Sequence, residues 1–200
     1  MTKGMKWWLN TDIRVIGKIP SKNKVVIYAI KHQSAWETVF CTDLFSMPSI
    51  VLKKALIFIP VIGLYFLRSG AIPISRDQGI NALKKMGRNA KRAVKEKRSM
   101  MIFPQGTRVS PGVSAKEKPY LPGVFFLYSQ TKVSVVPVAH NAGLLWPKNS
   151  FIKYPGRLKS KSITIKILPE IQPGLSKIEF LKKLETIIEN SSNELIKLES

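Results

Sequence analysis

Residues 25–37 have the sequence VVIYAIKHQSAWE, and this stretch decides how the chain is organised. Its first six residues are apolar and rich in β-branched side chains, which predicts a buried strand. The segment from Thr38 to Phe45 contains many apolar residues and no glycine or proline, so it predicts a helix. The polar residues 31–37 therefore lie at a strand-to-helix turn, where an open α/β sheet presents side chains to a crevice.

Two side chains of this turn, His32 and Glu37, can form a catalytic pair. Glu37 follows His32 by five residues and belongs to the first turn of the predicted helix. A carboxylate there can accept a hydrogen bond from one imidazole nitrogen and leave the other free to take a proton. The same residues also allow a structural interpretation, because Ser34 followed three residues later by Glu37 forms a capping box. The turn alone leaves both interpretations open.

Composition indicates a single domain over residues 1–200 with an anionic partner. The chain is 44% hydrophobic and carries a net charge of +21, from 33 Lys and Arg against 12 Asp and Glu. Such an imbalance favours nucleic acid, an anionic membrane surface or phosphorylated substrates as partners. The single Cys41 excludes an internal disulfide, and no signal-peptide pattern is present, so we expect a reducing, cytosolic environment.

The apolar segments are too short to span a membrane. The longest, Ala55 to Leu67, has 13 residues and contains Pro60 and Gly63, whereas a spanning helix needs about 20. We expect this run to be buried or to lie at a membrane interface. Tryptophan beside lysine in residues 1–12 suits an interfacial arm or a packed one.

The remaining pattern alternates strands with helices and predicts one α/β domain with a mixed sheet flanked by helices. A basic helix is expected at 78–98, and an amphipathic helix at 175–200 that begins with a capping box of Ser176 and Glu179. The apolar stripe of this last helix comprises Ile178, Leu181, Leu184, Ile188, Leu195 and Leu198. Further strands are expected at 13–19, 50–52, 70–75, 100–103, 133–139 and, half-exposed near a sheet edge, 163–168, with a short helix at 123–130.

Four motifs follow one another at predicted strand ends: HQSAWE from His32, GAIPISR ending at Arg76, FPQGTR at 103–108 and VVPV at 135–138. In this order they resemble the glycerolipid acyltransferases of the 1-acylglycerol-3-phosphate acyltransferase family, over a motif-bearing core of residues 25–141. That family commonly has His-x4-Asp in the first block and Phe-Pro-Glu-Gly-Thr-Arg in the third. Glu37 in place of Asp keeps the charge, whereas Gln105 in place of Glu removes a charge and adds a donor.

The resemblance implies transfer of a fatty acyl group from an acyl thioester, on CoA or acyl carrier protein, to the free hydroxyl of lysophosphatidic acid. His32 would be the general base and Glu37 its partner. No cofactor or metal is expected, since the sequence has no Cys pair and no His–acid cluster. The implied roles of the other residues are phosphate binding for Arg76, Arg108 and Lys53, a substrate-binding loop for Gln105, Gly106 and Thr107, and an acyl-chain or structural block for Val136, Pro137 and Val138.

Two alternatives stay open at this point. An enzyme of the same fold can use another acceptor, namely glycerol 3-phosphate, dihydroxyacetone phosphate or a lyso-aminolipid. A basic nucleic-acid-binding protein would show aromatic residues among its lysines and arginines, and the basic helix 78–98 has none. We therefore expect no nucleic acid, and peripheral attachment to an anionic membrane on its cytoplasmic face. His140 and Cys41 are expected to be structural.

Overall fold

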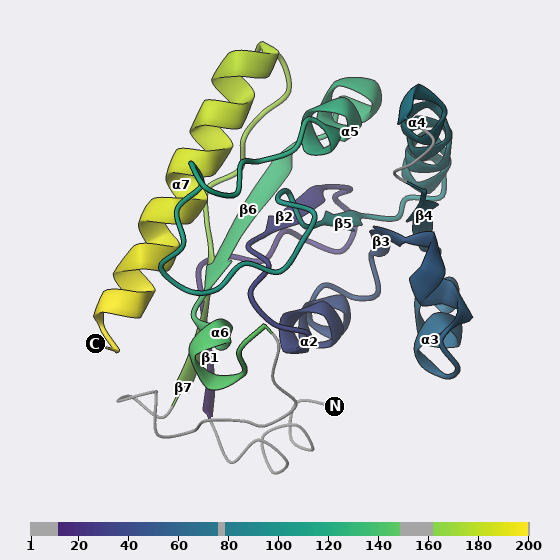
Figure 1. The fold of residues 1–200 in the computed structure, drawn as a ribbon. Helices are drawn as coiled ribbons and strands as arrows, with labels where there is room; N and C mark the ends of the chain where they lie inside the picture. Colours follow the sequence, from purple (N-terminus) through teal and green to yellow (C-terminus); the bar gives the residue numbers. More distant parts are fainter. Residues whose placement is uncertain (1–11, 76–78, 149–161, 200) are drawn as a thin grey trace.

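The computed structural model describes residues 12–75, 79–148 and 162–199, and its centre is a seven-stranded sheet (Figure 1). The strands lie in the order β1-β7-β6-β2-β5-β3-β4. All neighbours are parallel except β6 and β7, which are antiparallel, so the sheet is mixed as predicted. The strands are β1 (Asp12–Ile16), β2 (Ile27–Ile30), β3 (Ser49–Lys53), β4 (Ile72–Ile74), β5 (Met100–Ile102), β6 (Val135–His140) and β7 (Ser162–Ile167).

Helices cover both faces of this sheet (Figure 1). On one face α2, α3 and α6 contribute buried side chains to a core that includes Trp36 and Phe66. On the other face α4, α5 and α7 contribute to a second core that includes Met86 and Phe180. The α/β class with helices flanking a mixed sheet is therefore confirmed. The helices are α2 (Trp36–Leu44), the 3-10 helix η1 (Lys54–Phe58), α3 (Ile62–Arg68), α4 (Gly79–Lys95), α5 (Gly123–Thr131), α6 (Ala142–Leu145) and α7 (Lys177–Lys197).

The five parallel strands β6, β2, β5, β3 and β4 end at the same edge of the sheet. Ala29 of β2 lies opposite Ile102 of β5 and Pro137 of β6, and Lys53 of β3 lies opposite Ile74 of β4. The segments that follow these strands therefore leave the sheet at one edge, where open α/β sheets build their sites. Residues 31–37 and 103–108, which carry two of the motifs, meet there.

Two expectations about the C-terminal part were wrong. Strand β7 lies beside the edge strand β1, so its place near the sheet edge is as expected, but it is buried and not half-exposed. Ile163 and Ile165 are fully inaccessible because they pack in the core of the α2 face, and Lys166 pairs with Glu194 of α7. The ends of α7 also differ from the predicted stripe, since Ile178 is exposed whereas Phe180 is buried. Two residues turn a helix by about 200°, so these two side chains lie on opposite faces. Leu198 follows the end of the helix and is exposed as well. The capping box of Ser176 and Glu179 is confirmed.

The apolar run 55–67 forms a compact hairpin of η1 and α3. Its two helices approach closely at Gly63, where a Cβ atom would lie 1.8 Å from the carbonyl oxygen of Ile57, so only glycine fits. Phe66 is buried, whereas Phe58, Ile62 and Leu64 are exposed. No helix of the described residues is long and apolar enough to cross a membrane. The suggested arm at residues 1–12 lies outside the described residues except for Asp12, the first residue of β1.

Candidate active site

The turn after β2 brings the two predicted catalytic residues into contact. His32 Nδ1 lies 2.8 Å from Glu37 Oε1. The same carboxylate oxygen accepts the backbone N–H groups of Gln33, at 2.8 Å, and Ser34, at 2.7 Å. One oxygen of Glu37 therefore both orders the turn and binds the imidazole, a geometry that the structural and the catalytic interpretation each require. The capping box is only half formed, since the Ser34 hydroxyl accepts from Trp36 N instead of Glu37 N.

Glu37 is a buried carboxylate that stays ionised. It is 0% exposed, and burial by itself raises the pKa of such a group. Hydrogen bonds from His32 and from the backbone N–H of Ser34 oppose this effect of burial, and the pKa of Glu37 lies below its ordinary value. An ionised Glu37 accepts a proton-bearing nitrogen, so Nδ1 of His32 carries hydrogen, and in the neutral form of the ring the lone pair is on Nε2.

The His32 ring is held by a second contact, which sequence reasoning missed. It stacks on Phe103, the first residue after β5, with ring centroids 3.9 Å apart and planes inclined by 18°. The backbone carbonyl of His32 accepts the N–H of Val109 at 2.7 Å, which ties the 103–109 loop to the turn. Phe103 belongs to the FPQGTR motif, but its partner could be found only once β2 and β5 were known to be neighbours.

His140 is structural, as predicted. It ends β6, is fully buried, and lies within hydrogen-bonding distance, 2.6 Å, of the Lys31 carbonyl through Nε2. Its Nδ1 accepts the N–H of Ala142 at 3.2 Å, so Nε2 carries the proton that it donates to Lys31. Burial lowers the pKa of His140, in keeping with a neutral ring. Its function in the fold is to join β6 to the turn of His32.

Gln105 is directed into its own loop. Its side chain is buried, and Nε2 donates to the carbonyl of Lys118 at 2.9 Å. A glutamate carboxylate has no proton to donate to a carbonyl, so the departure from the family motif matches this loop. Next to it, Gly106 has a φ of +63°, a left-handed conformation that favours glycine. Direct substrate contact by Gln105, Gly106 or Thr107 stays a prediction.

The residues predicted to bind phosphate lie along the same sheet edge as far as they are described. Arg108 is half-buried beside Val109, the residue bonded to the His32 backbone, and forms no ion pair with the described residues. Lys53 is exposed at the end of β3. Arg76 lies outside the described residues, two positions beyond β4.

The fourth motif packs inside the sheet. Val136 and Val138 are buried in the same core as Trp36 of α2, and Val138 pairs with Ile30 at the end of β2. Pro137 lies opposite Ala29 on the neighbouring strand. These residues pair with β2 and pack in the core next to the turn of His32, which agrees with the prediction that the block is structural; contact with the acyl chain stays a prediction. Cys41 is fully buried, and burial raises the pKa of its thiol well above the usual value, as suits a packed core residue.

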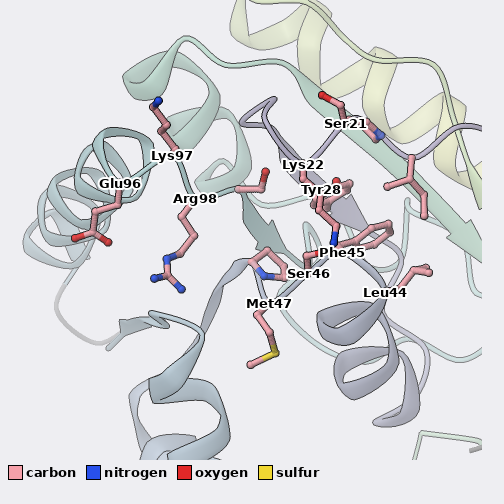
Figure 2. Close-up of a pocket in the computed structure, with 14 residues that line it drawn as sticks. Ser21, Lys22, Tyr28, Leu44, Phe45, Ser46, Met47, Glu96, Lys97 and Arg98 are labelled. Atoms are coloured by element: carbon pink, nitrogen blue, oxygen red, sulfur yellow. The ribbon is translucent and has the colours of Figure 1, made fainter. Parts of the chain in front are cut away.

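A groove of about 490 Å³ lies at the opposite edge of the sheet, and Figure 2 shows the residues that line it. Its walls include Met47 and Ser99, which precede β3 and β5, and Arg98 beyond α4. None of the candidate catalytic residues lines it. Among the described residues, no group of three or more His, Cys, Asp or Glu side chains is placed to hold a metal ion.

The family of the chain follows from comparison with known proteins. The family model described as Acyltransferase matches residues 12–141, which include the turn of His32, the FPQGTR loop and β6. The chain therefore belongs to the acyltransferase family.

The chain is also similar to individual acyltransferases whose names give a particular reaction. The chain is 36% identical over 148 residues to the 1-acyl-sn-glycerol-3-phosphate acyltransferase of Pseudomonas aeruginosa, over 74% of this chain and 56% of the relative. It is 29% identical over 147 residues to the enzyme of the same name from Saccharomyces cerevisiae, over 72% of this chain and 48% of the relative. The chain thus spans about half the length of the curated relatives it matches.

A solved structure is similar over nearly the whole chain. The crystal structure of the 1-acyl-sn-glycerophosphate (LPA) acyltransferase PlsC from Thermotoga maritima superposes with a TM-score of 0.77 at 25% sequence identity. The superposition covers 97% of this chain and 76% of that one. The fold class expected from the sequence is therefore also the fold of a named acyltransferase.

Proposed function

We propose that this protein transfers a fatty acyl group from an acyl thioester to the free hydroxyl of lysophosphatidic acid, giving phosphatidic acid. The observation that carries the proposal is the 2.8 Å contact between His32 Nδ1 and the buried, ionised Glu37, which leaves His32 Nε2 able to accept a proton. The names of the bacterial and yeast relatives support lysophosphatidic acid as the acceptor.

The chemistry needs one base and no protein nucleophile. His32 Nε2 removes the hydroxyl proton as the acceptor oxygen attacks the thioester carbonyl, which is worth typically about 10²–10⁴-fold in rate. The C–S bond then breaks, and the proton passes from His32 to the leaving thiolate. Glu37 holds the imidazole tautomer and stabilises the imidazolium formed in between. Neither Ser34 nor Cys41 is placed to act as a nucleophile, because both side chains are buried.

Arginine side chains suit the phosphate of the acceptor. A guanidinium group can grip a phosphate monoester through two parallel hydrogen bonds. Arg108 is adjacent to the residue bonded to the His32 backbone, so a phosphate on Arg108 places the acceptor near the base. Lys53 at the end of β3, and Arg76 after β4, are the further proposed contacts.

The enzyme is proposed to bind anionic membranes peripherally, on the cytoplasmic face, through the η1–α3 hairpin. Phe58 is 74% exposed and Val61 81% exposed, and Lys53, Lys54 and Arg68 flank the hairpin. No acidic residue occurs between positions 44 and 75. Inserted apolar side chains together with basic residues, each worth about 1 kcal/mol near an anionic surface, suffice for stable association.

Liposome flotation tests this attachment. Phe58→Ser, Ile62→Ser and Leu64→Ser combined should release the protein from vesicles that contain anionic lipid, because these side chains are exposed and carry little core packing. The control is Ile178→Ser with Leu198→Ser, two apolar residues on and beyond α7 that are at least as exposed as the hairpin residues, and it should float like the wild type. Unchanged flotation of the hairpin variant would exclude the hairpin as the insertion element.

Thiol release from an acyl thioester tests the activity and its acceptor. Oleoyl-CoA and an oleoyl acyl carrier protein are compared as donors, which neither the fold nor the relatives' names distinguish. Lysophosphatidic acid should be the best acceptor in a panel with glycerol 3-phosphate, dihydroxyacetone phosphate and a lyso-aminolipid. Preference for one of the other three acceptors would leave the family and the role of His32 as base unchanged and would replace lysophosphatidic acid as the proposed acceptor. Activity of His32→Ala above a few per cent of wild type would remove His32 as the base.

A further inference from the structure

The residue directly before His32 makes a buried ion pair that the catalytic pair does not require. Lys31 is 2% exposed, and its Nζ lies 2.6 Å from Glu189 Oε1 on α7. Tyr120 donates its hydroxyl hydrogen to the same carboxylate oxygen at 2.9 Å. Burying an ammonium group is costly unless it is paired and hydrogen-bonded. A lysine at the end of a central strand therefore depends on the C-terminal helix for its partner.

Lys31 and His32 leave β2 toward opposite faces of the sheet. Side chains alternate along extended backbone. Glu189 belongs to α7, on the face that α4 and α5 also cover, whereas Phe103 packs with the imidazole in the core of the α2 face. The ion pair thus anchors the turn from the side opposite to the imidazole.

The backbone around Lys31 is held as well, but by other elements. The N–H of Lys31 donates to Val138 at 3.0 Å, and its carbonyl accepts from His140 at 2.6 Å. The carbonyl of His32 accepts from Val109 at 2.7 Å. These contacts join the turn to β6 and to the loop after β5. Among the described contacts of residues 31 and 32, only the Lys31 side chain reaches α7.

We propose that Lys31, Glu189 and Tyr120 form a positioning site that holds the catalytic turn on α7 and so sets the orientation of His32. The inference rests on the proposed role of His32 as the base. Helix α7 begins 36 residues beyond the segment 12–141 that the family model matches, so a part of the chain outside that segment contributes to the rate. The physical reason is geometric, because a displacement of about 1 Å in a reacting group can cost about 10²-fold.

A triple variant separates positioning from stability. Lys31→Met, Glu189→Leu and Tyr120→Phe replace the ion pair and its hydroxyl by apolar groups of similar length, leaving no buried polar atom of the three unpaired. Replacement of a buried pair in this way is often neutral or stabilising, so the melting temperature should stay close to that of the wild type. With oleoyl-CoA and lysophosphatidic acid, kcat should fall at least about tenfold while both KM values change less than about twofold.

The matched control is the exposed ion pair of Lys166 with Glu194, which joins β7 to the same helix at 2.9 Å. Lys166→Met with Glu194→Leu should leave kcat unchanged. Wild-type kcat in the triple variant would overturn the positioning role. Should the triple variant fail to fold, Tyr120→Phe alone decides, since it removes only one hydrogen bond to Glu189. A kcat reduced about threefold at unchanged KM then supports the role, and wild-type kcat overturns it.

These outcomes are distinct from failure of the proposed function. A wild-type protein that releases no thiol with any acceptor, or a fully active His32→Ala variant, would overturn both the function and this inference. An active wild type with an inactive His32→Ala variant and a fully active triple variant would overturn the inference alone.

Discussion

Replacement of Glu37 by glutamine separates the contribution of its charge from that of its shape in the proposed catalytic pair. Glutamine has nearly the same size, and its carbonyl oxygen can still accept from Gln33 N and Ser34 N, which lie 2.8 and 2.7 Å from Oε1 in the wild type. What it cannot do is balance the imidazolium that forms when His32 takes a proton. Two unit charges about 4 Å apart attract by about 4 kcal/mol at an effective dielectric constant of about 20. Since about 1.4 kcal/mol is tenfold in rate, kcat should fall about 10³-fold.

The cost to stability should be smaller than the cost to the rate. A hydrogen bond to a charged acceptor is worth about 1.5–3 kcal/mol and one to a neutral acceptor about 0.5–1.5, so weakening three bonds costs a few kcal/mol, partly offset because no charge is buried. Urea unfolding measures that cost, and single-turnover acyl transfer with oleoyl-CoA and lysophosphatidic acid measures the rate.

Two control variants decide how the result is interpreted. Glu37→Asp keeps the charge but shortens the side chain, so it should retain more activity than Glu37→Gln if charge is what matters. Glu194→Gln removes an exposed carboxylate of α7 and should change neither kcat nor the unfolding free energy by a measurable amount. A Glu37→Gln variant within tenfold of the wild-type kcat would refute the reasoning and leave Glu37 as a residue that only orders the turn.

Three further predictions concern the surroundings of the pair. Arg108→Ala should raise KM for the phosphate-bearing acceptor at least tenfold more than KM for the acyl donor, because a charged hydrogen bond is worth about 1.5–3 kcal/mol; an equal rise for both substrates would make Arg108 structural. Gln105→Glu should lower the unfolding free energy by about 1–3 kcal/mol at neutral pH, since the buried carboxylate cannot donate to Lys118, and by less in acid, where a protonated carboxyl can; equal stability at neutral pH would contradict this. Burial lowers the pKa of His140 below its usual 6.5, so between the two pKa values the unfolded chain binds more protons than the folded one. The unfolding free energy should therefore fall as the pH drops below 6.5. Urea unfolding of His140→Gln at several pH values tests this, because the variant should lose less of its unfolding free energy over this pH range than the wild type.

Much of the candidate site could be predicted because it is local. The apolar strand, the polar turn and the following helix are consecutive, and the five-residue spacing of His32 and Glu37 already allows the 2.8 Å contact that the structure shows. The capping box of Ser176 and Glu179 is local in the same sense. Interactions between neighbours in the chain depend on backbone geometry that residue types at short spacing specify.

Other features depend on which strands lie side by side, and the chain order does not reveal that. Strand β2 lies between β5 and β6, so Phe103 stacks on His32 and His140 bonds to Lys31, across 71 and 109 residues of sequence. The burial of Ile163 and Ile165 in β7 has the same origin, because they pack in one core with α2, which is distant in sequence.

The sequence by itself determined the strand-to-helix turn, the proximity of His32 and Glu37 within it and the order of the four motifs, because each depends on residues that are close together in the chain. Only the tertiary structure decided what surrounds the pair: the direction of Gln105, the ring under His32, and the partner of Lys31 on a helix 158 residues away. The physical reason is that a buried polar group must find a hydrogen-bond partner wherever the fold supplies one. Contacts between residues distant in sequence can therefore be identified only when the order of the strands in the sheet and the packing of the helices on it are known.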